Sequence, residues 1–258
     1  MTISIQNAVD RMLDSRSSHR LLAPFSESVD EFSIAQAYAI QDALRADFNR
    51  RGERPIGWKL GATSQAGQTV MGVTEPACGF LLPARYGSGA DVSLGGYVDF
   101  RVEAEVVFKM GTKLVGPGIT AATAVLAVEG AGAALELLDF VFSGKPRGPD
   151  FIANSIVAKA IAVGSSLVPA RGLDLAREEV IYEHNGEVVG TYTAAEVMGN
   201  PLNALAWLAN HLATRGLTLE PGDLVMSGAI SKMLRPKAGD TVRARFARLG
   251  SVSINIVP

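Results

Sequence analysis

Two glutamates separated by one residue stand in the segment from Arg101 to Met110, RVEAEVVFKM. The alternation of apolar residues here predicts a β-strand on which Glu103, Glu105 and Val107 share one face. Residues two apart on a strand face lie about 6–7 Å from each other, so both carboxylates project from one surface. Two such charges favour a cation between them or a proton on one, and carboxylate oxygens suit Mg²⁺ or Mn²⁺. A solvent-facing edge strand with no ion fits the same pattern.

A third carboxylate comes from the apolar run Ala133 to Phe142, AALELLDFVF, which reads as a second buried strand. Glu136 and Asp139 lie inside this run, and a buried carboxylate is unfavourable unless it is paired or coordinated. Residues three apart face opposite sides of a strand, so only one of the two can join the first pair. The pattern does not decide between them.

Lys59 is the candidate acid, base or anion anchor. It stands in the short apolar run Ile56 to Gly61, IGWKLG, with bulky neighbours on both sides. A lysine ammonium in such a setting is a point charge that can donate a proton or hold an anion. The alternative is a lysine whose apolar stem is buried while its ammonium reaches water.

Composition narrows the class of protein. The 258 residues are 48% hydrophobic with a net charge of −2, which gives no electrostatic case for binding nucleic acid or an anionic membrane surface. The single cysteine, Cys78, excludes an internal disulfide and favours a reducing compartment. The three histidines show no zinc-ligand spacing. We therefore expect a cytoplasmic protein with no membrane span.

The elements that must position these side chains are predicted from local patterns. A helical stripe covers residues 2–15, and a capping box from Ser33 to Gln36 opens a second helix that ends near Arg51. Residues 62–82 are expected to form a glycine-punctuated binding loop or lid, and Gly144 to Pro149 a rigid loop. The other predicted elements are an alanine-rich helix at 120–130, a helix at 200–212, and strands at 56–61, 161–168, 179–193 (a hairpin turning at Asn185-Gly186), 224–226, 241–247 and 252–257.

Several short motifs keep a specific order and spacing along nearly the whole chain. They are Tyr38-Ala-Ile-Gln41, Gly57-Trp-Lys-Leu-Gly61, Gly72-Val73, the two-glutamate strand, Ala134-Leu-Glu-Leu-Leu-Asp139, Asn154-Ser155, Asn185-Gly-Glu-Val-Val189, Gly199-Asn-Pro201, Ala206-Trp-Leu-Ala-Asn210, Gly222-Asp223, Ser227-Gly-Ala229 and Leu249-Gly-Ser251. Together they resemble the 2-keto-4-pentenoate hydratase and 2-oxo-3-enedioate decarboxylase branch of the fumarylacetoacetate hydrolase superfamily.

The resemblance implies an α+β fold, a mixed β-roll with flanking helices, and division into a helical N-terminal segment at 1–54 and a catalytic domain at 55–258. It implies metal ligands at Glu103, Glu105 and Glu136, a catalytic lysine at Lys59, and assembly as a homo-oligomer. Asp139 is then expected to be structural, holding its loop with Arg147.

The loop Gly72-Val-Thr-Glu-Pro-Ala-Cys-Gly79 departs from the pattern Gly-Val-x-x-Pro-Asp-x-Gly that many hydratases of this branch carry. Ala77 stands where the aspartate would be, so the proton relay is either lost or moved to Glu75. The expected substrate-binding residues are Gly79, Phe80, Leu81, Asn154 and Ser227.

The implied function is a metal-dependent hydratase that adds water to a 2-hydroxy-2,4-dienoate and yields a 4-hydroxy-2-oxo acid in aromatic-compound catabolism. A decarboxylase of a 2-oxo-3-enedioate is the alternative, because both reactions proceed through the same enolate. A non-catalytic subunit that binds a 2-oxo acid, or that associates with a partner hydratase or decarboxylase, is a third. Hydrolytic cleavage ranks below these, because the setting of His19 does not match the histidine–acid pair of the hydrolase branch.

Overall fold

Two β-sheets and flanking helices make up the protein, whose computed structural model describes residues 3–29 and 31–258. The seven-stranded sheet has the order β2-β1-β10-β5-β6-β7-β3. Its strands are β1 (Gly57–Gly61), β2 (Ala77–Leu81), β3 (Arg85–Gly87), β5 (Phe100–Met110), β6 (Val128–Asp139), β7 (Ala158–Val163) and β10 (Leu224–Met226). The mixed α+β fold expected from the sequence is confirmed.

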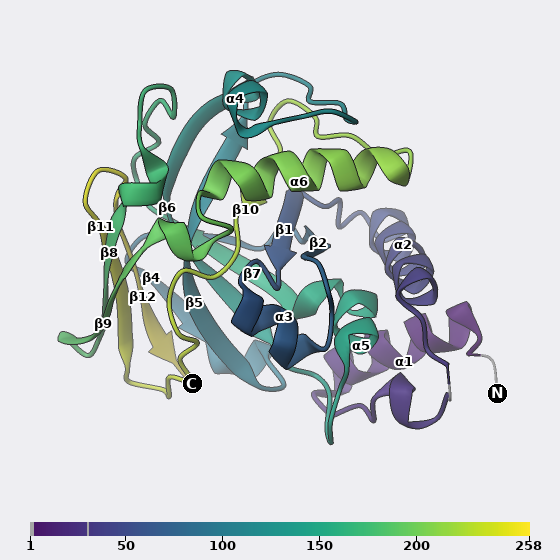
Figure 1. The fold of residues 1–258 in the computed structure, drawn as a ribbon. Coiled ribbons are helices and arrows are strands. Elements are labelled where there is room, and N and C mark those ends of the chain that lie inside the picture. Colours follow the sequence, from purple (N-terminus) through teal and green to yellow (C-terminus); the bar gives the residue numbers. More distant parts are fainter. Residues whose placement is uncertain (1–2, 30) are drawn as a thin grey trace.

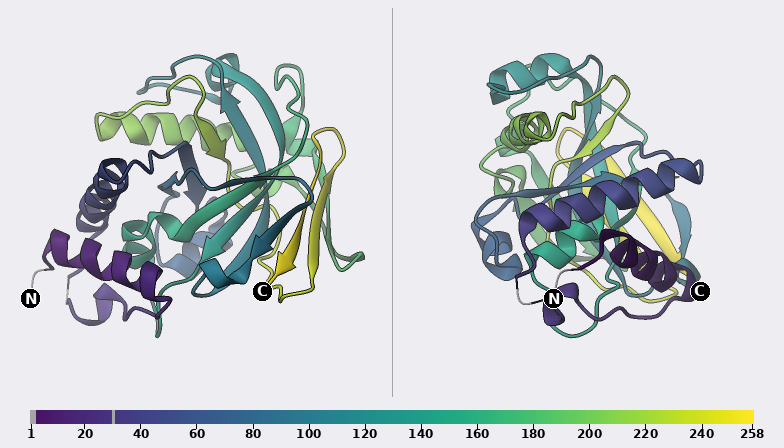
Figure 2. Two further views of the ribbon diagram at one scale, coloured as in Figure 1. Left: turned by 180° about the vertical axis from the view of Figure 1, so that it is seen from behind. Right: turned by 90° about the vertical axis from the view of Figure 1, so that its right-hand side faces the viewer.

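The two long strands β5 and β6 form the centre of the seven-stranded sheet and run antiparallel side by side (Figure 2). Their register places Glu103 directly opposite Glu136. On the other face of β5, Val102, Ala104 and Val106 are fully buried in the main core, as the alternation predicts.

The second sheet has five strands in the order β4-β12-β11-β8-β9 and lies at the left of Figure 1. Its strands are β4 (Ala90–Ser93), β8 (Glu179–His184), β9 (Glu187–Thr193), β11 (Thr241–Phe246) and β12 (Gly250–Val257). The predicted β8–β9 hairpin turns at Asn185 and Gly186, whose φ angles are 53° and 83°. Both values are positive, as a two-residue type I′ turn requires.

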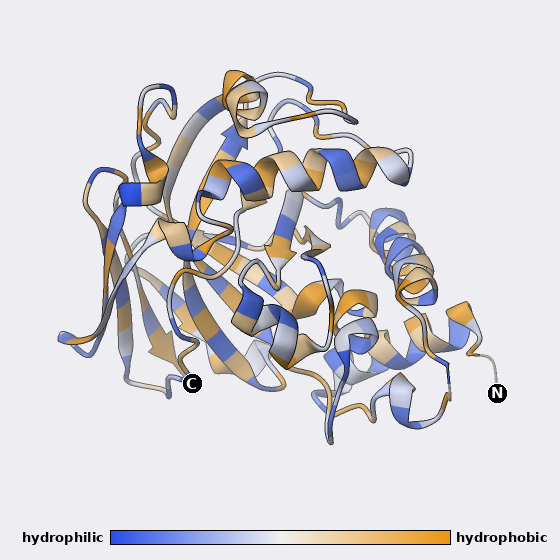
Figure 3. Ribbon diagram, in the orientation of Figure 1, coloured by the Kyte–Doolittle hydropathy of each residue, from blue (hydrophilic) through white to orange (hydrophobic). Residues whose placement is uncertain are grey.

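Helices α1 (Ile5–Ser18) and α2 (Ile34–Arg50) lie on the opposite side of the molecule from the five-stranded sheet (Figure 1). The predicted capping box is present at the start of α2, where Ser33 and Gln36 satisfy each other's backbone amides. Each helix turns an apolar stripe inward and a polar face outward (Figure 3). Both stripes belong to the same hydrophobic cluster as the sheets. The division of the chain at residue 54 stays a prediction.

The remaining helices lie around the sheets. They are α3 (Gln65–Met71), α4 (Ala121–Ala124), α5 (Gly148–Ala153) and α6 (Pro201–Thr214), with short 3₁₀ helices at Phe25–Glu27, Leu94–Gly96, Val125–Ala127, Leu175–Arg177 and Ala194–Glu196. No helix within the described ranges is long and apolar enough to cross a membrane.

The structure corrects the predicted loops. Residues 62–82 contain helix α3, capped by Ser64, and the buried edge strand β2, so they are not one continuous loop. The segment after Gly144 holds helix α5 instead of only a rigid loop. Two other elements were misplaced. Strand β7 begins at Ala158, and the helix expected at 120–130 is the single turn α4 followed by the 3₁₀ helix Val125–Ala127 and then by β6.

Candidate active site

Three carboxylates meet above the middle of the seven-stranded sheet. Glu103 and Glu105 project from β5 and Glu136 from β6, and one oxygen of each lies within 4.8 Å of one oxygen of the others. Glu105 and Glu136 have no exposed surface, and Glu103 is partly exposed. The strand register causes this meeting, because it sets Glu136 opposite Glu103 and brings the next same-face residue, Glu105, beside them.

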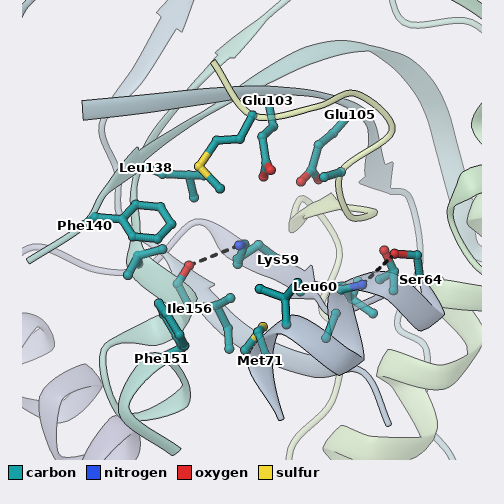
Figure 4. A pocket seen from close by; sticks show the side chains of 18 residues that line it. Lys59, Leu60, Ser64, Met71, Glu103, Glu105, Leu138, Phe140, Phe151 and Ile156 are labelled. Atoms are coloured by element: carbon teal, nitrogen blue, oxygen red, sulfur yellow. Dashed lines mark hydrogen bonds between the residues drawn. The ribbon is translucent and has the colours of Figure 1, made fainter. Parts of the chain in front are cut away.

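Lys59 completes the cluster from strand β1. Only 3% of its surface is exposed. Its Nζ lies 2.9 Å from Oε2 of Glu136 and donates a hydrogen bond of 3.2 Å to the carbonyl oxygen of Ile156. Figure 4 shows Glu103, Glu105 and Lys59 pointing toward one another from two strands. The snorkelling alternative for Lys59 is therefore wrong.

The pKa values of all three carboxyl groups are raised. The pKa of Glu103 is raised to about 7, first by burial and then by the negative charge of Glu136, and Lys59 partly opposes the rise. Burial followed by the charge of Glu136 raises the pKa of Glu105 well above its usual range. Burial also raises the pKa of Glu136, against the attraction of Lys59. Three acids and one lysine leave a net charge of −2 when all are ionised.

Hydrogen bonding from the protein satisfies this cluster only in part. Oε2 of Glu105 accepts a hydrogen bond of 2.8 Å from the backbone N–H of Gly228. Oε1 of Glu105 and Oε1 of Glu136 are buried and have no hydrogen-bond partner among the described residues. Buried polar atoms are normally paired, so these two oxygens mark a place where a cation would bind.

A cavity of about 210 Å³ opens beside the carboxylates. Its polar end holds Lys59, Glu103 and Glu105. The rest of its wall is mostly apolar and comes from α3, the end of β6, α5 and the loop after β10 (Figure 4). The larger apolar side chains there are Leu60, Val70, Met71, Leu138, Phe140, Phe151, Ile156, Val157 and Met233.

Asp139, the alternative to Glu136, has a different task. Its Oδ1 accepts hydrogen bonds from the backbone N–H groups of Val98 (2.7 Å) and Asp99 (3.0 Å), and its Oδ2 lies 3.7 Å from Nζ of Lys159. Asp139 is therefore structural, but the expected partner was wrong. Arg147 instead donates its backbone N–H to Asp150 and its guanidinium to the carbonyl of Ser26.

The other predicted site residues do not line the cavity. Glu75 is exposed on the loop after α3. Gly79, Phe80 and Leu81 are buried within β2, and Asn154 is buried where its Oδ1 accepts a hydrogen bond from Arg16. Ser227 is buried beside Glu105, next to the N–H donor Gly228. Their roles toward a substrate stay predictions.

A profile of the fumarylacetoacetate (FAA) hydrolase C-terminal family matches residues 62–257. The chain belongs to this family. It is 33% identical over 251 residues to 2-keto-4-pentenoate hydratase from Burkholderia vietnamiensis, covering 96% of each chain. It is 34% identical over 234 residues to 4-oxalocrotonate decarboxylase from Pseudomonas putida, covering 88% of this chain and 87% of the relative.

The fold of the protein is also similar to that of a solved structure. The 4-oxalocrotonate decarboxylase from Pseudomonas putida G7, complexed with magnesium and adipate, superimposes with a TM-score of 0.95 at 27% identity, and 99% of each chain is covered. The fumarylacetoacetate hydrolase-like fold and the branch expected from the motifs are thereby confirmed.

Sequence reasoning missed most of the cavity wall of this family member. Glu136, Leu138 and Phe140 are spaced by two, so the alternation that exposes Glu136 to the site could have found the other two. Helix α3 and the loop with Met233 reach the site only through tertiary packing. No local pattern predicts the backbone N–H of Gly228 as a partner of Glu105.

Proposed function

We propose that the protein is a divalent-metal-dependent lyase that hydrates a 2-hydroxy-2,4-dienoate to a 4-hydroxy-2-oxo acid. The observation that carries this proposal is the meeting of three carboxylates and one buried lysine at the polar end of an otherwise apolar cavity. Hydratases and decarboxylases among the relatives support the reaction class.

The cluster fits a hard divalent cation. Glu103, Glu105 and Glu136 would hold it, because they offer carboxylate oxygens as ligands and a net charge of −2 with Lys59. Oε1 of Glu105 and Oε1 of Glu136 have no hydrogen-bond partner within residues 3–29 and 31–258. The magnesium in the decarboxylase complex supports Mg²⁺, and Mn²⁺ has the same preference for oxygen. When bound, the ion supplies positive charge against the carboxylate and the C2 oxygen of a 2-oxo acid.

Lys59 is the proposed proton carrier. Its ammonium has three N–H donors, of which Ile156 and Glu136 occupy two. The third is left for the substrate at the polar end of the cavity. The conversion of a dienol to an enone requires a proton to move along the carbon chain, and a buried lysine beside that chain can donate and accept it.

The apolar wall favours the hydratase over the decarboxylase. Lys59 is the one cationic side chain in the described cavity lining, and it lies at the carboxylate end. Arg101 shares the strand face of Glu103, but its guanidinium stacks on the ring of Phe140 and pairs with Asp99 at 2.7 Å. A second carboxylate on the substrate would find no second cationic side chain in the described lining, whereas an alkyl tail would contact apolar side chains.

The decarboxylase of a 2-oxo-3-enedioate stays the second candidate, because a relative named for that activity shares 34% identity and the TM-score of 0.95 belongs to such an enzyme. A non-catalytic binding subunit is the third.

One assay separates the three. Purified protein is treated with chelator and given 2-hydroxypenta-2,4-dienoate, its 5-alkyl homologues, or a 2-oxo-3-enedioate, with and without Mg²⁺. We expect metal-dependent loss of dienol absorbance, a product heavier by one water, and a rise in kcat/KM of about fourfold per added methylene. Loss of CO₂ from the enedioate at a higher kcat/KM would establish the decarboxylase. Metal binding without turnover of any substrate would establish the binding subunit.

Assembly and location belong to the same proposal. We expect a homo-oligomer, because β9 is an edge strand of the five-stranded sheet and exposes Val188 and Val189 (57% and 43%) for a second copy to cover. Light scattering after size-exclusion chromatography tests this. Association with a partner hydratase or decarboxylase and a cytoplasmic location stay predictions.

A further inference from the structure

Three successive residues after helix α5 have left-handed backbone conformations. The φ angles of Ser155, Ile156 and Val157 are 54°, 50° and 55°. None is glycine, and two are β-branched. A left-handed conformation costs about 1–2 kcal/mol per L-residue, and such strain persists only where surrounding structure holds it.

Strands β1 and β2 hold this left-handed turn (residues 155–157). The Oγ of Ser155 donates a hydrogen bond of 2.9 Å to the carbonyl of Phe80. Two glycines make room for the turn: a Cβ on Gly79 would lie 2.4 Å from the carbonyl oxygen of Ser155, and one on Gly61 would lie 2.6 Å from Cγ2 of Ile156. The turn is therefore clamped against β1, which carries Lys59, and against its neighbour β2.

The residues before the turn are fixed as well. Oδ1 of Asn154 accepts a hydrogen bond of 2.9 Å from Arg16 of α1. The Nε2 of Gln41 on α2 donates to the carbonyls of Cys78 on β2 (2.9 Å) and Ile152 on α5 (2.7 Å). Three helices thus hold the approach to the left-handed turn.

What the strained turn supplies to the site is one carbonyl oxygen. Ile156 directs its carbonyl to Nζ of Lys59 at 3.2 Å, and the dashed line in Figure 4 marks this bond. The direction of a carbonyl follows from φ and ψ, so a right-handed backbone at Ile156 would aim it elsewhere. Without that acceptor, the ammonium would be drawn toward the three carboxylates by charge alone.

We propose that the left-handed turn at 155–157 is a positioning element that keeps the Lys59 ammonium at the floor of the cavity. Lys59 then contacts the carbonyl of Ile156 and Oε2 of Glu136, which leaves Oε1 of Glu136 and Oε1 of Glu105 for a cation. Gly79, Phe80 and Asn154 thereby act on the site through the turn. The inference rests on the proposed function only in assigning Lys59 a task in turnover.

A double-mutant cycle tests whether the turn acts through Lys59. Ser155→Ala removes the clamp to Phe80, and Gly79→Ala pushes against the turn from outside the cavity. In the wild-type background we expect kcat to fall about tenfold, the equivalent of one hydrogen bond, while KM and the metal dissociation constant change less than threefold. In the Lys59→Ala background, the same substitutions are expected to change the residual kcat less than twofold.

Cys78→Ala is the matched control, since Cys78 is the neighbour of Gly79 on β2, is fully buried, and has hydrogen-bond partners for its Sγ in Tyr38 and Arg215. We expect it to lower the melting temperature slightly and to leave kcat within twofold of wild type.

A readout that does not depend on activity is the ¹H–¹⁵N signal of the Lys59 ammonium, assigned by its absence in Lys59→Ala. It is expected to shift or broaden in Ser155→Ala and Gly79→Ala and to stay in place in Cys78→Ala.

Three results would overturn the inference: an equal loss of kcat in both backgrounds, no loss in either, or an ammonium signal that neither turn variant moves. A wild-type protein without turnover on any substrate would reject the proposed function alone, and the ammonium signal would then still decide the role of the turn. If Gly79→Ala does not fold, Ser155→Ala carries the cycle by itself.

Discussion

Replacing Glu103 by glutamine should stabilise the metal-free protein while abolishing its activity. The pKa of Glu103 is raised from 4.5 to about 7 by burial and by Glu136. A carboxyl whose folded pKa is raised binds its proton more tightly in the folded than in the unfolded state. Near pH 4 both states are protonated and there is no penalty. The penalty grows as pH rises from 4.5 and is complete above about 7.

The expected size follows from the shift. A change from 4.5 to about 7 corresponds to about 3 kcal/mol at 1.36 kcal/mol per pKa unit. Glutamine keeps the shape of the protonated acid and carries no charge. The free energy of unfolding of Glu103→Gln should therefore match that of the wild type near pH 4 and exceed it by up to about 3 kcal/mol at pH 8, or about 6–10 °C in Tm for a chain of this size.

Saturating Mg²⁺ should reverse this difference and make the wild type more stable to unfolding than Glu103→Gln. An ion at 100 times its Kd stabilises the folded wild type by about 2.7 kcal/mol, and Glu103→Gln has lost one of the three proposed ligands. Urea unfolding between pH 4 and 8, after chelation and again with saturating Mg²⁺, measures both effects. Glu129→Gln is the control, because Glu129 forms an exposed ion pair with Lys109, and such pairs contribute about 0–1 kcal/mol.

Two results would refute this reasoning. Curves of unfolding free energy against pH that run parallel for wild type and Glu103→Gln would show that burial and the charge of Glu136 do not raise the pKa of Glu103 in the folded state. Full activity of Glu103→Gln with Mg²⁺ would show that the cluster is not the metal site.

Two other substitutions separate catalysis from folding. Lys59→Ala should lower kcat at least about 100-fold, the usual contribution of a positioned acid or base. Calorimetric titration of this variant should still show metal uptake. A variant that takes up no metal would show that the role of the lysine is structural. Asp139→Ala should lower the free energy of unfolding by about 2–3 kcal/mol, because it removes a fully buried acceptor and leaves the partly buried N–H groups of Val98 and Asp99 unpaired. It should leave the Kd for metal within twofold of wild type. A large loss of metal affinity would instead make Asp139 part of the metal site.

Features encoded by neighbouring residues were predictable from the sequence. The capping box of α2 needs only Ser33 and Gln36, and the β8–β9 turn needs only Asn185 and Gly186. The shared face of Glu103 and Glu105 likewise follows from the period of a strand.

Helix α3 was missed although its ends carry recognisable signals. Ser64 accepts a hydrogen bond from the N–H of Gly67, and Gly72 ends the helix with a φ of 67°. None of the residues between Gln65 and Met71 is buried, so no apolar stripe marks the helix. Cap residues alone predict a helix weakly when its side chains do not enter the core.

The choice between Glu136 and Asp139 could not be made from spacing, because it depends on how two strands pair. A slip of one residue in the β5–β6 register would turn the opposite face of β6 toward the site. The observed pairing of Glu103 with Glu136 is set by the whole length of both strands and by their packing. Only the family resemblance carried that information at the level of sequence.

Gly79 and Asn154 show that a residue of a site motif can also be restricted by contacts within the protein. Their expected contact with the substrate stays a prediction. Within the protein, a Cβ on Gly79 would lie 2.4 Å from the carbonyl oxygen of Ser155, and Asn154 accepts a hydrogen bond from Arg16. A residue that packs against the turn whose Ile156 carbonyl points at Lys59 is as restricted in type as a residue that binds the substrate. At Gly79, for example, a Cβ would collide with the turn. A motif therefore records positions on which the site depends, and the structure adds which contacts each of them makes within the protein.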